Sequence, residues 1–148
     1  MKLFYGVKRF FSSADMYKNL GLLVLRLGIG GSMIAFHGYG KLIGGPHTWE
    51  QIGSNMQYLG IDVMPMLWGL LAALAEFFGS LLIIFGVFFR PAALALACTM
   101  AVAVVRHLSL PPFMPGAGWG AASHAMELFT VYIALFLTGP GNYRIPRW

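Results

Sequence analysis

The sequence has few charged residues for its length. Only 10% of its 148 residues are charged, whereas 58% are hydrophobic. A soluble domain carries about 25% charged residues, which cover its surface. So few charges cannot solvate a globule, and lipid must therefore cover much of this chain. At about 20 apolar residues per crossing, the chain has room for four transmembrane helices and short loops.

Cysteine is equally scarce. The single cysteine, Cys98, has no second cysteine with which to form an internal disulfide or a CxxC redox pair. Because it lies within an apolar run, we interpret it as an inert buried thiol. The glycine-rich stretch at 111–123 lacks the lysine of a P-loop and the strand that precedes a Rossmann turn, so it does not indicate nucleotide binding.

Four apolar runs predict an all-α fold, an integral membrane four-helix transmembrane bundle formed by one domain over residues 1–148. The predicted spans are 19–37, 65–89, 92–108 and 121–138. Between them, 42–64 is expected to be a long loop, and Arg90-Pro91 a two-residue hairpin. Residues 2–11 mix aromatic with basic side chains, which is typical of an amphipathic segment in the membrane interface.

The net charge of +5 is distributed beside the apolar runs, which indicates membrane orientation and contact with anionic lipid rather than nucleic-acid binding. Basic residues on one side of the predicted bundle outnumber those on the other: Lys2, Lys8, Arg9, Lys18, Arg90, Arg144 and Arg147 against Lys41, with Arg106 near the boundary. The positive-inside rule therefore places both termini in the cytoplasm. The expected location is the inner membrane of a bacterium, crossed several times.

The second span shows which of its faces is buried. Residues that share the face of Glu76 are all small: Gly69, Ala72, Ala73, Gly79 and Ser80. The opposite face carries leucines and phenylalanines. Because small residues mark close helix contacts in membranes, Glu76 is predicted to point into the protein.

Ionisable residues within the spans form the candidate site. A charge at the centre of a bilayer costs several kcal/mol unless it is paired or hydrated, so acids and arginines there are expected to meet. We predict an Arg26–Glu76 pair, with Arg106 near Glu127 and His124. The candidate ligand site is expected in the outer half of the membrane. Its residues are Arg26, His37, Lys41, Glu76, Arg106, His107, His124 and Glu127. No metal site and no catalytic residue is predicted.

Three stretches resemble the DoxX family of small four-helix membrane proteins. They are LVLRLGIGGSMIAFHGYGKL, AEFFGSLLIIFGVFFRPAALAL and the closing LTGPGNY at 137–143. The resemblance implies that certain residues occupy motif positions of the family. They are Arg26, His37, Gly38, Lys41, Glu76, Gly79 and Gly139-Pro140-Gly141. The resemblance also implies a connection with subunits of thiosulfate:quinone oxidoreductase and with redox homeostasis. No cysteine pair or metal-ligand motif is present to handle sulfur.

Several functions are compatible with this pattern. The leading hypothesis is a subunit or accessory of a quinone-linked redox system, because imidazole and carboxylate groups can hydrogen-bond a quinone and exchange its protons. Haem b held by two of His37, His107 and His124 is a weaker alternative. A carboxylate-bridged metal pair would need more acids than the spans contain. Polar helix ends and a structural ion pair are the simplest interpretation of the same residues.

Two other functional classes also remain open, and each implies different partners besides the bilayer itself. One is a non-catalytic assembly subunit that docks to a membrane complex or to copies of itself. The other is a small transporter or carrier of a hydrophobic molecule, for which Arg26 and Glu76 would gate access. Whether the protein is an enzyme is not decided by the sequence.

Overall fold

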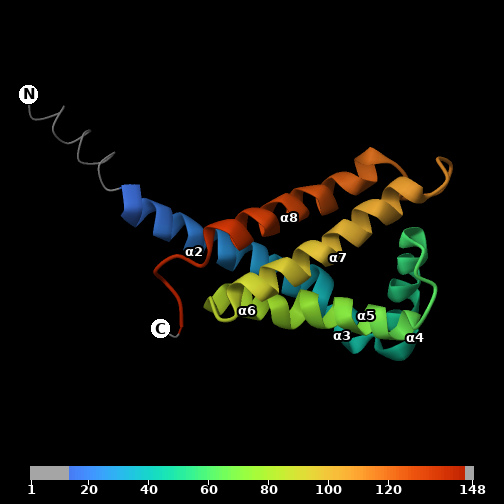
Figure 1. Cartoon of the computed structure of the whole chain (residues 1–148), viewed down its shortest axis with the longest axis horizontal. Coiled ribbons are helices and arrows are strands. Elements are labelled where there is room, and N and C mark those ends of the chain that lie inside the picture. The colour runs from blue at the N-terminus through green and yellow to red at the C-terminus, as the bar shows by residue number, and fades with distance from the viewer. Residues whose placement is uncertain (1–13, 146–148) are drawn as a thin grey trace, which may run out of the picture.

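The computed structural model describes residues 14–145, and every regular element in that range is a helix. Four of the helical stretches are long and apolar enough to cross a membrane. The all-α, four-helix membrane architecture is thereby confirmed (Figure 1). The interfacial segment predicted at 2–11 lies outside the described residues, and the cytoplasmic location of the termini stays a prediction.

The first membrane-crossing stretch is longer than predicted. It consists of α2 (Ala14–Met33), a π-helical turn η1 (Ile34–Gly38) and α3 (Tyr39–Ile43). The prediction ended this span at residue 37, in a glycine-rich sequence. Glycine lowers helix propensity by about 1 kcal/mol, but tertiary packing can override such a preference. In the folded chain Gly38 is buried directly against the backbone of Glu76 and Phe77, a contact that a side chain would block.

The expected loop at 42–64 is largely helical. It contains α4 (Gly45–Gly53) and a short 3-10 helix, η2 (Ser54–Leu59). α4 packs closely along the next helix, α5 (Pro65–Leu74), and a Cβ atom on Gly53 or Gly69 would overlap the backbone of the opposing helix. The prediction was wrong because nine residues are too few to show a membrane span, and the packing partner of α4 lies in a different segment.

The second crossing continues from α5 through another π-helical turn, η3 (Ala75–Gly79), into α6 (Ser80–Phe85). It ends at Gly86, whose left-handed backbone (φ 72°) suits glycine and forms a helix C-cap with bonds to Leu82 and Ile83 carbonyls. The predicted hairpin at Arg90-Pro91 is therefore misplaced. The turn lies at 86–88, and Pro91 occupies the first turn of α7 (Phe89–Ser109), where a missing N–H needs no partner.

The fourth crossing, α8 (Trp119–Thr138), packs along α7, while α2 packs against α6. We call the end of the molecule that holds the 86–88 turn and the 139–145 tail the terminus side. The opposite end, with α4, η2 and residues 110–118, is the connector side. The helices lie close together at the terminus side and spread apart toward the connector side (Figure 1). This splayed arrangement positions the candidate site.

Candidate ligand site

Glu76 lies at the centre of the site and is fully buried, as its small-residue face predicted. Its Oε1 accepts a hydrogen bond and ion pair from Nζ of Lys41 at 2.6 Å, and the Lys41 side chain is 29% exposed. The carboxylate comes from η3 and the ammonium from α3, so the pair joins the first two crossings. The predicted Arg26–Glu76 pair is therefore wrong, because Lys41 takes the place of Arg26.

The direction of the side chains explains this exchange of partners. Side chains on an α-helix lean toward the helix N-terminus. The first crossing begins at the terminus side, so both Arg26 and Lys41 lean toward that side. The second crossing begins at the connector side, so Glu76 leans toward the connector side. Lys41 and Glu76 therefore converge, whereas Arg26 and Glu76 diverge.

Arg26 is buried in a separate structure at the terminus side. Its guanidinium donates to four backbone carbonyls, those of Ile83 (2.8 Å), Ile84 (2.6 Å), Pro140 (2.7 Å) and Tyr143 (2.6 Å). The first two belong to the last turn of α6, where helix carbonyls lack intrahelical partners. Arg26 thus caps α6 and ties the C-terminal tail to it. This role is structural, and Arg26 is not part of the ligand site.

Two π-helical turns, η1 and η3, lie against each other beside the ion pair. A π-helical turn inserts one extra residue and redirects the side chains around it, and such turns are frequent at functional sites. η1 contains His37 and Gly38, and η3 contains Glu76. Both turns therefore adjust the first two helices at the position where His37 and Glu76 face the same space.

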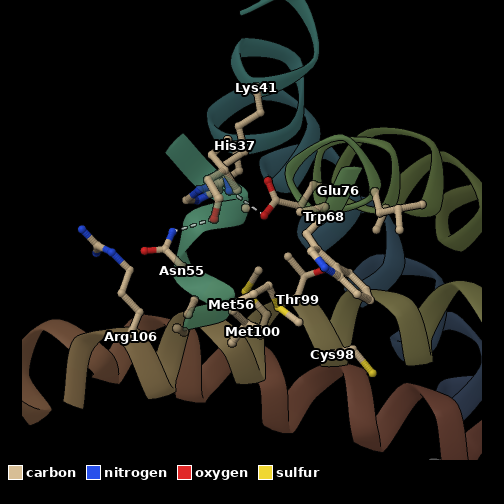
Figure 2. Close-up of a pocket in the computed structure, with 18 of the residues that line it drawn as sticks. His37, Lys41, Asn55, Met56, Trp68, Glu76, Cys98, Thr99, Met100 and Arg106 are labelled. Atoms are coloured by element: carbon tan, nitrogen blue, oxygen red, sulfur yellow. Dashed lines mark hydrogen bonds and ion pairs between the residues drawn. The ribbon is translucent and has the colours of Figure 1, made fainter. Parts of the chain in front are cut away.

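That space is a cavity of about 730 Å³ between the splayed helices on the connector side (Figure 2). It is lined by six of the eight predicted site residues: His37, Lys41, Glu76, Arg106, His107 and His124. Glu127 does not line it. In Figure 2, Lys41 and His37 approach Glu76 from one wall, and Trp68 and Thr99 lie below Glu76. The sequence therefore identified most of the polar wall of the cavity.

The imidazoles at this site are held in different ways. The rings of His37 and His124 stack with their centroids 5.7 Å apart at an interplanar angle of 25°, which links the first and fourth crossings. His107 instead lies 2.6 Å from the carbonyl oxygen of Gly116 through Nδ1, and its own carbonyl accepts from the N–H of Gly118. His107 thus holds the 110–118 connector at the rim of the cavity.

Arg106 and Glu127 do not form the predicted pair. Within the described part of the chain, neither of them takes part in an ion pair. Arg106 lies on the cavity wall, whereas Glu127 lies on an exposed face of α8. Residues 14–145 also contain no group of three or more His, Cys, Asp or Glu residues that could hold a metal ion.

The apolar part of the cavity was missed by sequence reasoning. It includes Met56 of η2, Trp68 of α5, and Met100 and Leu128 of α7 and α8. Leu71 of α5 and Cys98 of α7 also line the cavity, and both are exposed. Cys98 is therefore not the buried thiol that its apolar surroundings indicated. No local sequence pattern could have revealed η2 as a wall of the cavity.

Among the described residues, three fully buried oxygen atoms have no hydrogen-bond partner: Oε2 of Glu76, Oγ of Ser80 and the hydroxyl of Tyr132. Ser80 and Tyr132 lie close to each other, one turn beyond Glu76 toward the terminus side. Buried polar groups without a partner are rare, and each one calls for an explanation such as a water or a ligand. A tyrosine within an apolar span was the available signal for Tyr132, which the prediction did not use.

The model of the DoxX family matches residues 21–108 of this chain, which is more than half of its length. The chain belongs to the DoxX family. The matched region covers the first three crossings, including the Lys41–Glu76 pair and the connection through Arg26 to α6, and it ends before α8. No curated protein and no solved structure matches the chain.

Proposed function

We propose that this DoxX-family protein binds the head group of a lipid-soluble quinone in the connector-side cavity, as a subunit or accessory of a redox system in a bacterial inner membrane. The observation that carries the proposal is the burial and incomplete hydrogen bonding of Glu76. Its carboxylate is fully buried and paired with Lys41 through one oxygen, while the other oxygen has no partner among the described residues. A cavity that is otherwise largely apolar adjoins this group.

The cavity residues fit the chemistry of such a ligand. Ligand pockets have volumes of about 300–1,000 Å³ and combine apolar walls with a few polar groups that orient the ligand. In this cavity Lys41 and the two stacked histidines supply hydrogen-bond donors, and Met56, Trp68 and Met100 supply apolar surface for a ring. When bound, a quinone supplies two-electron, two-proton redox chemistry.

The role of Glu76 in this proposal is to hold and release protons at the cavity wall. A carboxylate within hydrogen-bond reach of a ligand can act as a proton donor or acceptor. Lys41 donates to Oε1 of Glu76, and Oε2, which is buried and has no partner among the described residues, leaves one position for a proton. Ser80 and Tyr132 would extend this group of exchangeable protons deeper into the bundle.

The histidine geometry favours a quinone over haem b. Axial histidines of a haem point one ring nitrogen each at a shared iron. The rings of His37 and His124 instead face each other in a stack, and Nδ1 of His107 is engaged by Gly116. A transport path is also less well supported, because the helices close together on the terminus side around Arg26 (Figure 1).

The test is quinone binding to protein purified in nanodiscs. Short-chain ubiquinone and menaquinone analogues should quench the fluorescence of Trp68 saturably, and Trp68→Phe should remove that component. Glu76→Gln and Lys41→Met should each weaken binding about tenfold, since each removes one charge-assisted hydrogen bond worth about 1.5–3 kcal/mol. Organic extracts of the native membrane preparation should contain quinone in proportion to protein.

Two matched controls distinguish the cavity from general surface effects. Glu50→Gln and Lys18→Met change exposed residues of the same types that do not line the cavity, and both should bind as the unaltered protein does. Thermal unfolding of each variant shows whether it is folded. Folded Glu76→Gln and Lys41→Met variants that bind quinone as tightly as the controls would refute the proposal.

A further inference from the structure

The exposed face of α8 has an unusual composition for a membrane helix. Its exposed residues that do not line the cavity are small or polar between the two ends: Gly120, Ser123, Glu127, Thr130 and Ala134, followed by Leu137 and Thr138. The buried face of the same helix carries Leu128, Tyr132 and Leu135. The large side chains thus point into the protein, and the small and polar ones point outward. Lipid contact favours the opposite arrangement.

The other crossings provide an internal comparison. The exposed residues of α2 include Val24 and Leu27, and those of the second crossing include Leu71, Phe78 and Phe85. These large apolar side chains suit contact with acyl chains. The exposed mid-helix residues of α7 are Leu94, Ala95 and Cys98, none of which is ionisable. The exposed acid in mid-helix therefore distinguishes α8 from the other three crossings.

Glu127 lies in the middle of this face. At a rise of 1.5 Å per residue, it is about 12 Å along α8 from Trp119 and about 16 Å from Thr138, close to the centre of the bilayer. An acid at that depth is costly when it faces lipid, and such residues almost always pair within protein. Within residues 14–145, Glu127 takes part in no ion pair, which leaves this face open to a partner from another chain.

The hydroxyl groups around Glu127 determine the chemistry of that partner. Ser123 and Thr130 each donate their hydroxyl hydrogen to a carbonyl of their own helix, those of Gly120 and Met126. Thr138 does the same to Ala134. Their oxygens consequently offer only lone pairs to a neighbour, as does the Glu127 carboxylate. This stretch of the face presents acceptors and lacks donors.

We infer that this α8 face docks a transmembrane helix of another membrane protein, one that carries an arginine or lysine at the depth of Glu127. Small residues such as Gly120 and Ala134 allow the two backbones to approach closely. The basic side chain neutralises Glu127, and its remaining N–H groups can reach the hydroxyl oxygens of Ser123 and Thr130. The negative charge of Glu127 thus favours a partner helix that carries a positive charge.

A second copy of this chain does not supply that cation. Of the basic residues in the described crossings, Arg26 is buried and Lys41 is paired with Glu76. Lys18, Arg90 and Arg106 lie near the ends of their helices, away from the mid-membrane depth of Glu127. Two identical α8 faces would place acceptors opposite acceptors and bring two carboxyl groups together at one depth. The docking partner is therefore a different chain.

The test uses synthetic helices as defined probes. Leu/Ala transmembrane peptides with a central Arg, Gln or Leu are labelled with an acceptor dye and mixed in vesicles with donor-labelled protein. Energy transfer should show the Arg peptide binding about tenfold more tightly than the Leu peptide, as expected for a polar contact of about 1–2 kcal/mol in a membrane. Glu127→Leu should abolish this preference, and Glu50→Gln should leave it unchanged.

Two results would overturn the inference. One is equal binding of the Arg and Leu peptides to the folded protein. The other is energy transfer between labelled copies of the protein itself that Glu127→Leu abolishes, which would assign the face to a second copy. Because Glu127 does not line the cavity, quinone binding should be unchanged in Glu127→Leu, and failure of either proposal can be recognised separately.

Discussion

The terminus side and the connector side of this small bundle use their buried charges differently. At the terminus side, Arg26 meets four backbone carbonyls from two segments, and every guanidinium nitrogen donates a hydrogen bond. At the connector side, Glu76 is equally buried, but within the described residues only one of its oxygens has a partner, Lys41. The hydrogen bonding of Arg26 is complete, and Arg26 does not line the pocket at the terminus side, whereas the hydrogen bonding of Glu76 is incomplete and Glu76 lines the connector-side cavity.

This difference separates a structural charge from a functional candidate. Both residues satisfy the same sequence criterion, an ionisable side chain within a membrane span. What distinguishes them is the completeness of their hydrogen bonding and whether the residue itself lines a cavity, as Glu76 does and Arg26 does not. A buried charge whose partners are all backbone carbonyls fixes the fold, while a buried charge with a free oxygen at a cavity wall can still accept a ligand or a proton.

The largest effect should come from the terminus side. Arg26→Leu removes four hydrogen bonds to a charged donor and leaves buried carbonyls without partners, which should cost about 4 kcal/mol or more. Since whole proteins are stable by only about 5–15 kcal/mol, we expect a large loss of folded protein. Thermal unfolding in detergent measures this. Arg90→Leu, an exposed arginine nearby, is the control, and equal stability of the two variants would contradict a structural role for Arg26.

The contact between α4 and α5 should be the next most sensitive to substitution, as measured by stability. Gly53→Leu or Gly69→Leu places a side chain where α4 and α5 meet backbone to backbone, and overpacking of this kind costs about 1–3 kcal/mol. The variant should unfold at a lower temperature, which thermal unfolding in detergent measures. Gly40→Leu is a suitable control because no atom lies within 4 Å of its added Cβ. If the unfolding temperature of Gly53→Leu equals that of the original protein, α4 does not pack tightly against α5.

The ion pair of the connector side should have a smaller effect on stability. Removing one partner alone, by Lys41→Met or Glu76→Gln, should cost about 2 kcal/mol, less than for a fully buried pair because Lys41 is partly exposed. The double variant should lose less than the sum of the two single losses, which a double-mutant cycle of unfolding free energies measures. Strictly additive losses would show that the two groups do not interact.

The smallest effect should come from the histidine stack. His124→Ala removes the ring that packs against His37, and aromatic pairs contribute about 0.5–1.5 kcal/mol. We expect a slight decrease in unfolding temperature with a clear decrease in quinone binding. His47→Ala, an exposed histidine on α4, should change neither quantity. A loss of stability larger than that of the Lys41 and Glu76 variants would show that the stack, and not the ion pair, holds the connector side together.

Much of the fold was predictable because it depends on composition and on local periodicity. Apolar runs of sufficient length identified the four crossings, and the run of small residues around Glu76 identified its buried face. The hairpin at 86–88 and the helical character of 45–59 were missed. The helix at 45–53 depends on a segment distant in sequence, since α4 at Gly53 crosses α5 at Gly69. The turn at 86–88 had a local signal, Gly86, which the prediction did not use.

The sequence predicted which residues belong to the candidate site, but not which of them pair with one another. Six of the eight residues do line one cavity, but both predicted charge pairs are absent from the described part of the chain. Depth in the membrane was an insufficient criterion for predicting charge pairs. It describes the position of a Cα atom but not the direction in which the side chain leans. Opposite helix directions bring Lys41 to Glu76 and carry Arg26 to the carbonyls of α6.

The sequence by itself determined that this chain crosses the membrane as four helices and that Glu76 points inward, since burial of apolar surface and exclusion of charge from lipid act on every residue where it stands. Only the tertiary structure decided which charge Glu76 meets, where the cavity lies and which face of α8 is left uncovered. These outcomes depend on the directions, splay and close approach of separate helices, which no single segment of the chain encodes.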